Sequence, residues 1–217
     1  LFRRLNAPQE VSLSSDGTLT IHHQGQKTRF HDPPERLFAV YQQINRYFHY
    51  LWLKRDDARA YHAISRALEY PVENPFLKGV LLCFRGNLEI LQGRYREGEA
   101  SLQKAHQLHP FNNDIVHRLC EIPFLEGKPL QAVDLSQDQY SEYRNFWGLA
   151  SGKELFEFYC YLQAGHFLEA ELSISRACGN RAEDIHYYRG IHSLFTGEYI
   201  EAVKHLGLGQ REAARSK

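Results

Sequence analysis

The stretch that decides the fold is Gly86–Pro110, GNLEILQGRYREGEASLQKAHQLHP. Apolar residues recur at helical spacing on both sides of its Gln-Gly-Arg-Tyr turn, which predicts two helices joined near Gly93. Small residues at Gly98 and Ala105 would let the second helix approach the first closely. The stretch therefore predicts one helical hairpin.

The turn of this hairpin recurs along the chain. Glycines in the same setting stand at Gly93, Gly127, Gly165 and Gly197, at intervals of 34, 38 and 32 residues. An alanine follows each of the last three five residues later, and Gly98 takes that place after the first. A period of this length is typical of helical-repeat arrays, in which each hairpin is one repeat.

The pattern resembles that of the tetratricopeptide repeat family. A 34-residue unit that starts at Gly79 places the family's small and large residues at Leu82, Gly86, Tyr95, Gly98, Leu102, Ala105 and Pro110. Arg85 and Glu89 stand where the family has apolar residues, which predicts looser packing on that side of the first helix. Weaker units begin near Asn113, Ser151 and Glu183.

The resemblance implies a mostly α fold: a right-handed α-α superhelical solenoid of about five helical hairpins, with a small N-terminal β-hairpin or meander. The hairpins are expected near 36–71, 79–112, 113–150, 151–182 and 183–210, within a repeat domain over 35–210. A short β-rich segment over 1–34 precedes this domain, and a polar tail over 211–217 follows it. A lone hairpin is marginal in water, so the repeats must stack.

Residues 10–31 form the β region. Apolar and polar residues alternate from Val11 onwards, and Asp16-Gly17 supplies a hairpin turn. Two or three short strands cannot bury a core alone, so they should lean on the first helices or on a further part of the protein. Asp32 is expected to cap the helix that follows, with proline in its first turn.

The 38-residue interval between turns holds Ser141–Gly152, whose glycines and serines predict a loop or bent connection. Phe146 and Trp147 lie inside it. They are expected to fill the gap between stacked repeats, and the alternative is an exposed aromatic anchor.

Charge and hydropathy exclude several classes of protein. The chain has 26 Lys and Arg residues and 26 Asp and Glu residues, so no global field attracts nucleic acid or an anionic membrane surface. This balance does not exclude a local basic patch. No apolar run approaches the roughly 18 residues that span a bilayer. Four cysteines without a CxxC pair fall in expected helices, which favours buried thiols in a reducing compartment and a cytoplasmic address. They are Cys83, Cys120, Cys160 and Cys178.

No motif for catalysis or for a cofactor is present in the sequence. The chain has no Gly-x-Ser-x-Gly elbow, P-loop or dinucleotide fingerprint, so we expect neither enzyme activity nor a small-molecule substrate. The closest histidine groups lack the four-ligand spacing of a structural zinc site, and no metal or cofactor is expected. These groups are His22-His23 with His31, His106 with His109, and His186 with His192.

The resemblance further implies a concave groove lined by the first helix of each repeat. Its positions fall on Asn45, His49, Asn87, His117, Glu121, Leu155, Tyr159, Tyr187 and Ile191. The first three repeats present polar side chains there, and the last two present aromatic and aliphatic ones suited to apolar anchors. The alternative is that Tyr159, Tyr187 and Ile191 pack against a neighbouring repeat or the C-terminal helix.

The leading functional hypothesis is a protein–protein interaction module, an adaptor or chaperone that binds a peptide or amphipathic helix of another protein. A clamp for C-terminal carboxylates is disfavoured, because Cys83, Gly152 and Phe156 replace its basic and amide residues. One alternative is the helical-repeat part of a signalling or transcription regulator, since Gln26–Phe38 faintly resembles the entry to a winged helix. Another is a structural assembly subunit, with a homo-oligomer possible.

Overall fold

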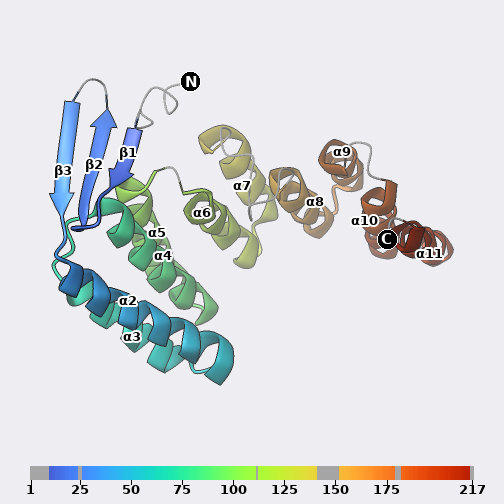
Figure 1. Ribbon diagram of the computed structural model, residues 1–217. Helices are drawn as coiled ribbons and strands as arrows, with labels where there is room; N and C mark the ends of the chain where they lie inside the picture. The colour runs from blue at the N-terminus through green and yellow to red at the C-terminus, as the bar shows by residue number, and fades with distance from the viewer. Residues whose placement is uncertain (1–9, 24–25, 111, 141–151, 179–181, 216–217) are drawn as a thin grey trace. The chain divides into compact units, whose positions relative to one another are not determined.

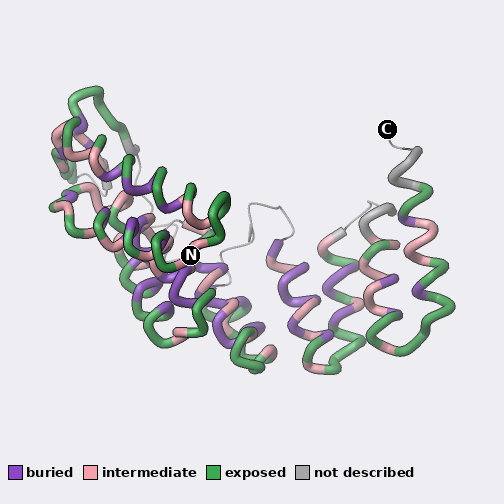
Figure 2. Tube along the Cα trace, turned by 90° about the horizontal axis from the view of Figure 1, so that it is seen from below, coloured by how far each residue is buried: buried purple, intermediate pink, exposed green. Residues whose placement is uncertain are grey.

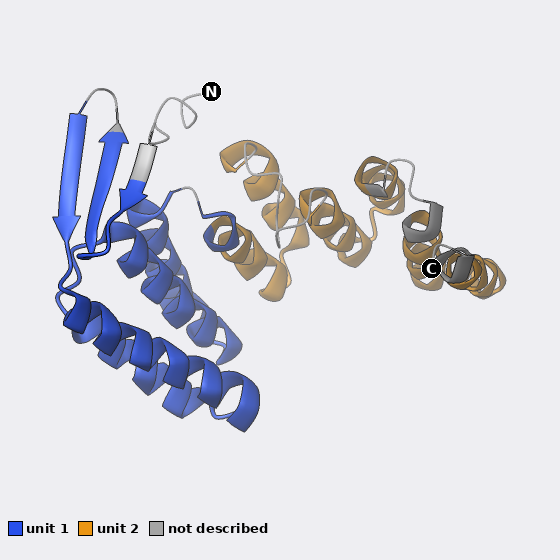
Figure 3. Ribbon diagram, viewed as in Figure 1, with its two compact units in different colours: residues 1–115 blue, residues 116–217 orange. Residues whose placement is uncertain are grey.

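A computed structural model of the protein describes residues 10–23, 26–110, 112–140, 152–178 and 182–215. The chain divides into two compact units, residues 1–115 and residues 116–217 (Figure 3). Phe146 and Trp147, for which the sequence predicts a packing role, lie outside the described residues.

The first unit joins a small sheet to two helical hairpins (Figure 1). The antiparallel sheet has the order β1-β2-β3 and pairs Leu13 with Leu19 and Ile21 with Thr28. Its strands are β1 (Glu10–Leu13), β2 (Thr18–His23) and β3 (Gln26–His31). The helices are α2 (Pro34–Phe48) with the π-helical segment η1 (His49–Lys54), α3 (Asp57–Glu69), α4 (Pro75–Leu91) and α5 (Tyr95–Leu108).

The second unit is helical throughout its described residues (Figure 1). Its elements are α6 (Asn113–Leu125), α7 (Pro129–Asp134) with the π-helical segment η2 (Leu135–Gln139), α8 (Gly152–Ala164), α9 (Phe167–Cys178), α10 (Ala182–Phe195) and α11 (Tyr199–Arg215). The first three residues of α6 belong to the first unit. The mostly helical fold with a small N-terminal sheet is confirmed. The polar segment that was expected from residue 211 continues α11 as far as Arg215.

The four recurring glycines end the first helix of their hairpins in the same way. Gly93, Gly127, Gly165 and Gly197 have φ angles between 73° and 80°, a left-handed conformation that glycine adopts without steric cost. The next backbone N–H reaches back to an otherwise unpaired carbonyl, as Arg94 does to Glu89 at 2.8 Å. In the first hairpin Arg55 takes this place, with a φ of 53°.

The small residues of the Gly86–Pro110 hairpin allow α4 and α5 to approach closely. A Cβ on Gly86 would lie 2.8 Å from Cγ of Leu102, and a Cβ on Gly98 would lie 3.1 Å from the backbone oxygen of Gly86. Neither position has room for a side chain unless the helices move apart.

Each unit has its own hydrophobic core, and buried residues line the inner faces of the hairpins (Figure 2). In the first unit this core lies between α2, α3 and α4. In the second unit Phe158, Leu162, Ala170 and Ile174 pack between α8 and α9. Three of the four cysteines are buried, as expected: Cys83, Cys120 and Cys160. Burial raises the pKa of the Cys120 thiol to about 12.

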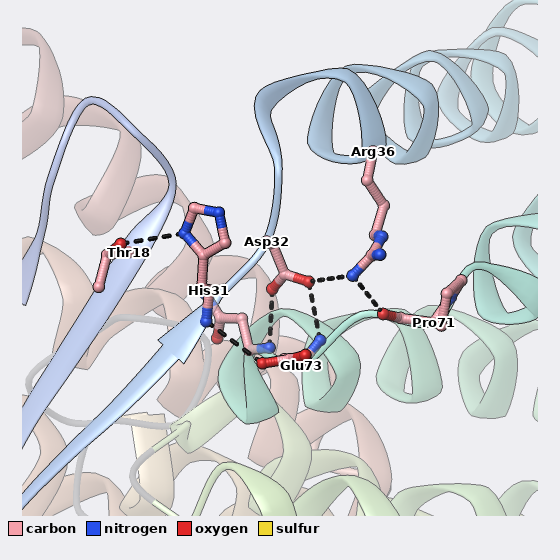
Figure 4. A network of polar contacts seen from close by, with 7 residues as sticks. Thr18, His31, Asp32, Arg36, Pro71 and Glu73 are labelled. Atoms are coloured by element: carbon pink, nitrogen blue, oxygen red, sulfur yellow. Dashed lines mark hydrogen bonds and ion pairs between the residues drawn. The ribbon is translucent and has the colours of Figure 1, made fainter.

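Asp32 does not cap the helix that follows it, contrary to the sequence prediction. The capping position of α2 is Pro33, while the buried Asp32 carboxylate accepts backbone N–H bonds from Glu73 and Asn74, both at 2.8 Å (Figure 4). Arg36 lies 3.5 Å from the same carboxylate and donates to the Pro71 carbonyl at 2.9 Å. Asp32 therefore fastens the end of the sheet to the loop between α3 and α4.

The polar residues of α4 do not loosen its packing, which corrects a second prediction. Glu89 is buried and accepts a hydrogen bond from the Ser101 hydroxyl at 2.6 Å, while Arg85 lies 3.6 Å from its carboxylate. The charge is compensated inside the hairpin rather than turned to solvent, because hydroxyl and guanidinium donors surround it.

Candidate functional site

The expected groove residues of the first hairpin lie on an exposed, aromatic face of α2 and η1. Asn45 and His49 are both exposed. Phe38, Tyr41 and Trp52 are also exposed. Together with Asn45 and His49 they follow one another at spacings of three or four residues, so the five lie on the same face. These three rings were not among the expected groove residues, although their periodic spacing around Asn45 is visible in the sequence.

In the second hairpin Asn87 is half-buried on α4. Its side-chain nitrogen lies 3.9 Å from the sulfur of the buried Cys83. Its side-chain oxygen is buried without a hydrogen-bond partner in the part of the chain that the structure describes. Asn87 thus contributes a polar group beneath the surface, with little exposed area of its own.

His117 and Leu155 belong to the core and not to an accessible groove. His117 on α6 is only 1% exposed, and its ring packs edge-on against Phe156 of α8 at 5.5 Å. Burial lowers the pKa of His117 to about 3, so the ring is neutral at physiological pH. Leu155 on α8 is likewise buried. Both residues were expected in the groove, but they are buried, and Phe156 of the neighbouring helix α8 covers the His117 ring.

Glu121 is half-buried on α6 and forms an ion pair with Arg118 one turn earlier on the same helix. Because Arg118 neutralises it, the Glu121 carboxylate would attract a cationic ligand only weakly. Its contribution to binding would be polar and weak, because exposed and half-exposed ion pairs are worth little.

Tyr159 lies on α8, and Tyr187 and Ile191 lie on α10; these are the first helices of two successive hairpins. Burial raises the pKa of the Tyr159 phenol, and Tyr187 adds to this effect. Tyr159 and Ile191 are half-buried against the core of the second unit, whereas Tyr187 is 52% exposed. Leu194, exposed one turn after Ile191, extends this face. We call these four residues the α8–α10 surface.

The α8–α10 surface combines apolar area with hydroxyl groups. Tyrosine side chains supply large apolar rings and a polar tip with few rotatable bonds, so they lose little entropy on binding. Such residues, partly held by a core below, are typical anchors of protein interfaces.

The histidines form one pair that the sequence spacing did not indicate. His186 lies beside His205 of α11, with the two Nδ1 atoms 3.2 Å apart, while His192 contacts the Phe167 carbonyl at 2.9 Å. Burial and the neighbouring His186 lower the pKa of His205. Within the described ranges, no three histidine, cysteine, aspartate or glutamate residues gather as metal ligands would.

No protein-family model and no curated protein matches the chain. Among solved structures, the crystal structure of a tetratricopeptide repeat protein from Parabacteroides merdae is similar, with a TM-score of 0.60. The likeness covers 82% of this chain and 68% of that chain at 18% identity. The chain has a tetratricopeptide-like helical repeat fold.

At 18% identity the likeness carries the fold alone, so the residues that make contact must come from this chain's own surfaces. Across the described residues, every helix is too short or too polar to cross a membrane.

Proposed function

We propose that the protein is a non-enzymatic interaction module, of the adaptor or chaperone kind, that holds a peptide or amphipathic helix of another protein on the α8–α10 surface. The observation that carries this proposal is the apolar row on α10, which is exposed at Tyr187 and Leu194 and half-buried at Ile191 between them. Tyr187, Ile191 and Leu194 follow one another at spacings of four and three residues, and so share one face of the helix.

The chemistry of this row suits an apolar helix better than an extended polar peptide. A helix that packs on α10 would insert its own residues, at spacings of three and four, between Tyr187 and Leu194. Each large apolar side chain that such contact removes from water contributes on the order of 1.5–3 kcal/mol. The Tyr159 and Tyr187 hydroxyls would fix the register at the edge of the contact.

The aromatic face of α2 and η1 supports a binding role for the first unit as well. Exposed Phe38, Tyr41 and Trp52 surround Asn45 and His49 there. Asn45 and His49 offer hydrogen bonds to a peptide backbone, and the rings offer apolar contact. We propose this face as a second contact region, separate from the α8–α10 surface. The buried thiols of Cys120 and Cys160 fit a reducing compartment, and we propose a cytoplasmic address on this ground.

The test is partner capture by matched tyrosine variants. Proteins that cross-link to a photoreactive residue at position 187 are first identified by mass spectrometry, and their affinity is then measured with purified chain. Tyr187→Ala combined with Tyr159→Ala should weaken binding by at least roughly thirtyfold, because two anchors at about 1 kcal/mol or more each are lost. The helical circular dichroism spectrum should be retained.

Tyr199→Ala is the matched control. Tyr199 is 68% exposed on α11, the second helix of the same hairpin. Its replacement should leave the affinity unchanged. Equal binding by the double variant, or equal loss with Tyr199→Ala, would contradict the proposed surface.

A further inference from the structure

The first hairpin carries a basic pocket that has no part in the α8–α10 surface. It has a volume of about 290 Å³ and lies between α2, η1 and α3. The polar residues that line it are Gln43, Arg46, Tyr50, Arg59, His62 and Arg66. We call it the arginine pocket.

The sequence of α3 builds most of this pocket. Arg59, His62 and Arg66 follow one another at spacings of three and four residues and so share one face of the helix. The opposite face of α3 is buried in the core through Ile64 and its neighbours. Arg46 joins the three residues from α2.

The positive charge of the pocket is only partly compensated. Arg59 pairs with Asp56 at 3.3 Å and lies over the Tyr50 ring, 5.8 Å from its centre. Arg46 and Arg66 form no ion pair with any residue that the structure describes. Since the chain carries equal numbers of acidic and basic residues, this is a local concentration of charge and not part of a general basic surface.

A second pocket of about 260 Å³ continues from the first. It shares Gln43 and Arg66 with the arginine pocket and adds Glu69, Tyr70 and Pro71 at the end of α3. Glu69 places a negative charge at this end, so the combined cleft is basic at one end and mixed at the other. An anion would therefore sit among the arginines, and the atoms that carry it would extend towards Tyr70.

We infer that the arginine pocket binds a phosphate monoester. Guanidinium groups present paired N–H donors that match phosphate oxygens, and the basic side chains here are arginines and a histidine, without lysine. The two unpaired guanidiniums together balance the charge of about −1.5 to −2 that a phosphate monoester carries at pH 7. The confined volume and the neutral remainder of the chain disfavour a nucleic acid, which needs a broad basic surface.

The phosphate monoester has two possible sources: a phosphorylated side chain of a protein segment or a small phosphorylated metabolite. Three probes separate them by calorimetry on the full chain at low ionic strength: a peptide with a central phosphoserine, free O-phosphoserine, and the same peptide with glutamate in place of phosphoserine. Saturable binding of one phosphoserine probe per chain is expected. Tighter binding of the peptide than of O-phosphoserine would assign the site to a protein segment, and equal binding would assign it to a small phosphorylated ligand.

Matched variants tie this binding to the pocket. Arg46→Gln and Arg66→Gln should each weaken binding by about tenfold or more, because each removes a charge-assisted hydrogen bond. Arg66→Lys should weaken it less, since it keeps the charge and loses only the paired donors. Arg96→Gln, at an exposed position of α5 outside the pocket, should have no effect.

Three results would overturn the inference. One is the absence of saturable binding of both phosphoserine probes to the wild-type chain. Another is equal loss of binding in Arg96→Gln and Arg66→Gln, both with unchanged circular dichroism, which would show a diffuse attraction rather than a site. Binding of the glutamate peptide as tight as that of the phosphoserine peptide would also contradict the assignment to phosphate.

Discussion

Glu89 in the first unit and Glu157 in the second are both buried carboxylates on a first helix, and they are held in different ways. Around Glu89 the close donors are hydroxyls: Ser101 at 2.6 Å and Tyr61 at 3.0 Å. Tyr61 comes from α3 and Ser101 from α5, so the carboxylate of Glu89 links two successive hairpins. Arg85 lies farther away, at 3.6 Å, and donates instead to the Ser101 hydroxyl at 3.3 Å.

Glu157 depends more on cations. The Ser136 hydroxyl lies 3.1 Å from its carboxylate but also 2.9 Å from the Val133 carbonyl, and its single proton cannot serve both fully. Arg176 and Lys153 stand 3.7 Å and 3.9 Å away. The comparison teaches that a buried carboxylate on a first helix can be tolerated either by short hydroxyl bonds or by surrounding charge.

Removal of either carboxylate gives the largest expected effect. Glu89→Ala should destabilise the first unit by about 3–5 kcal/mol, because it leaves Arg85 and two hydroxyls without their acceptor inside the hairpins. Hydrogen exchange of α4 and α5 peptides measures this loss, and α8 and α9 peptides serve as an internal reference. Glu157→Ala should instead lower the protection of α8 and α9 peptides and leave that of α4 and α5 peptides unchanged. A loss of protection below about 1 kcal/mol for Glu89→Ala would contradict the proposed importance of the hydroxyl bonds.

Removal of the serine hydroxyls should separate the two arrangements. Ser101→Ala should cost about 2–3 kcal/mol, since it removes the shortest bond to a buried charge, whereas Ser136→Ala should cost about 1 kcal/mol because its proton is shared. Urea denaturation of each variant, followed by hydrogen exchange to assign the affected unit, measures the difference. Equal losses at the two sites would show that the second hydroxyl matters as much as the first.

Arg176→Gln should have the smallest effect. Arg176 is 58% exposed and lies 3.7 Å from Glu157, so water screens most of the attraction, and the expected loss is about 0–1 kcal/mol. Lys153, whose side chain is 12% exposed, is the stronger of the two cations. Urea midpoints at low and high salt test this order: Lys153→Gln should lower the midpoint more than Arg176→Gln, and salt should change the Lys153→Gln effect little because a buried ion pair is screened less. A larger loss from Arg176→Gln than from Lys153→Gln would reverse our ranking.

The hairpins could be predicted from the sequence because their determinants are local. Glycines such as Gly93 mark the left-handed turns, and apolar spacing marks the helix faces on either side. The role of Asp32 could not be predicted in this way, because its partners Glu73 and Asn74 lie more than 40 residues away in the chain.

The candidate site was predictable only in part. Tyr187 and Asn45 are exposed on first helices, in keeping with their expected positions, but His117 and Leu155 are covered by neighbouring helices. The proposed binding roles of the exposed residues stay predictions. The sequence did not exclude a local basic patch, but it did not predict the arginine pocket. The pocket depends on how Arg46 of α2 meets the basic face of α3.

The sequence by itself determined where helices begin, turn and end, since helix periodicity and the left-handed preference of glycine act within a few residues. It also determined which residues, such as Gly86 and Gly98, must be small for two helices to touch. The tertiary structure alone decided which helix faces remain exposed and which carboxylates are neutralised. Burial and pairing depend on neighbours that are distant in the chain, and no local pattern records them.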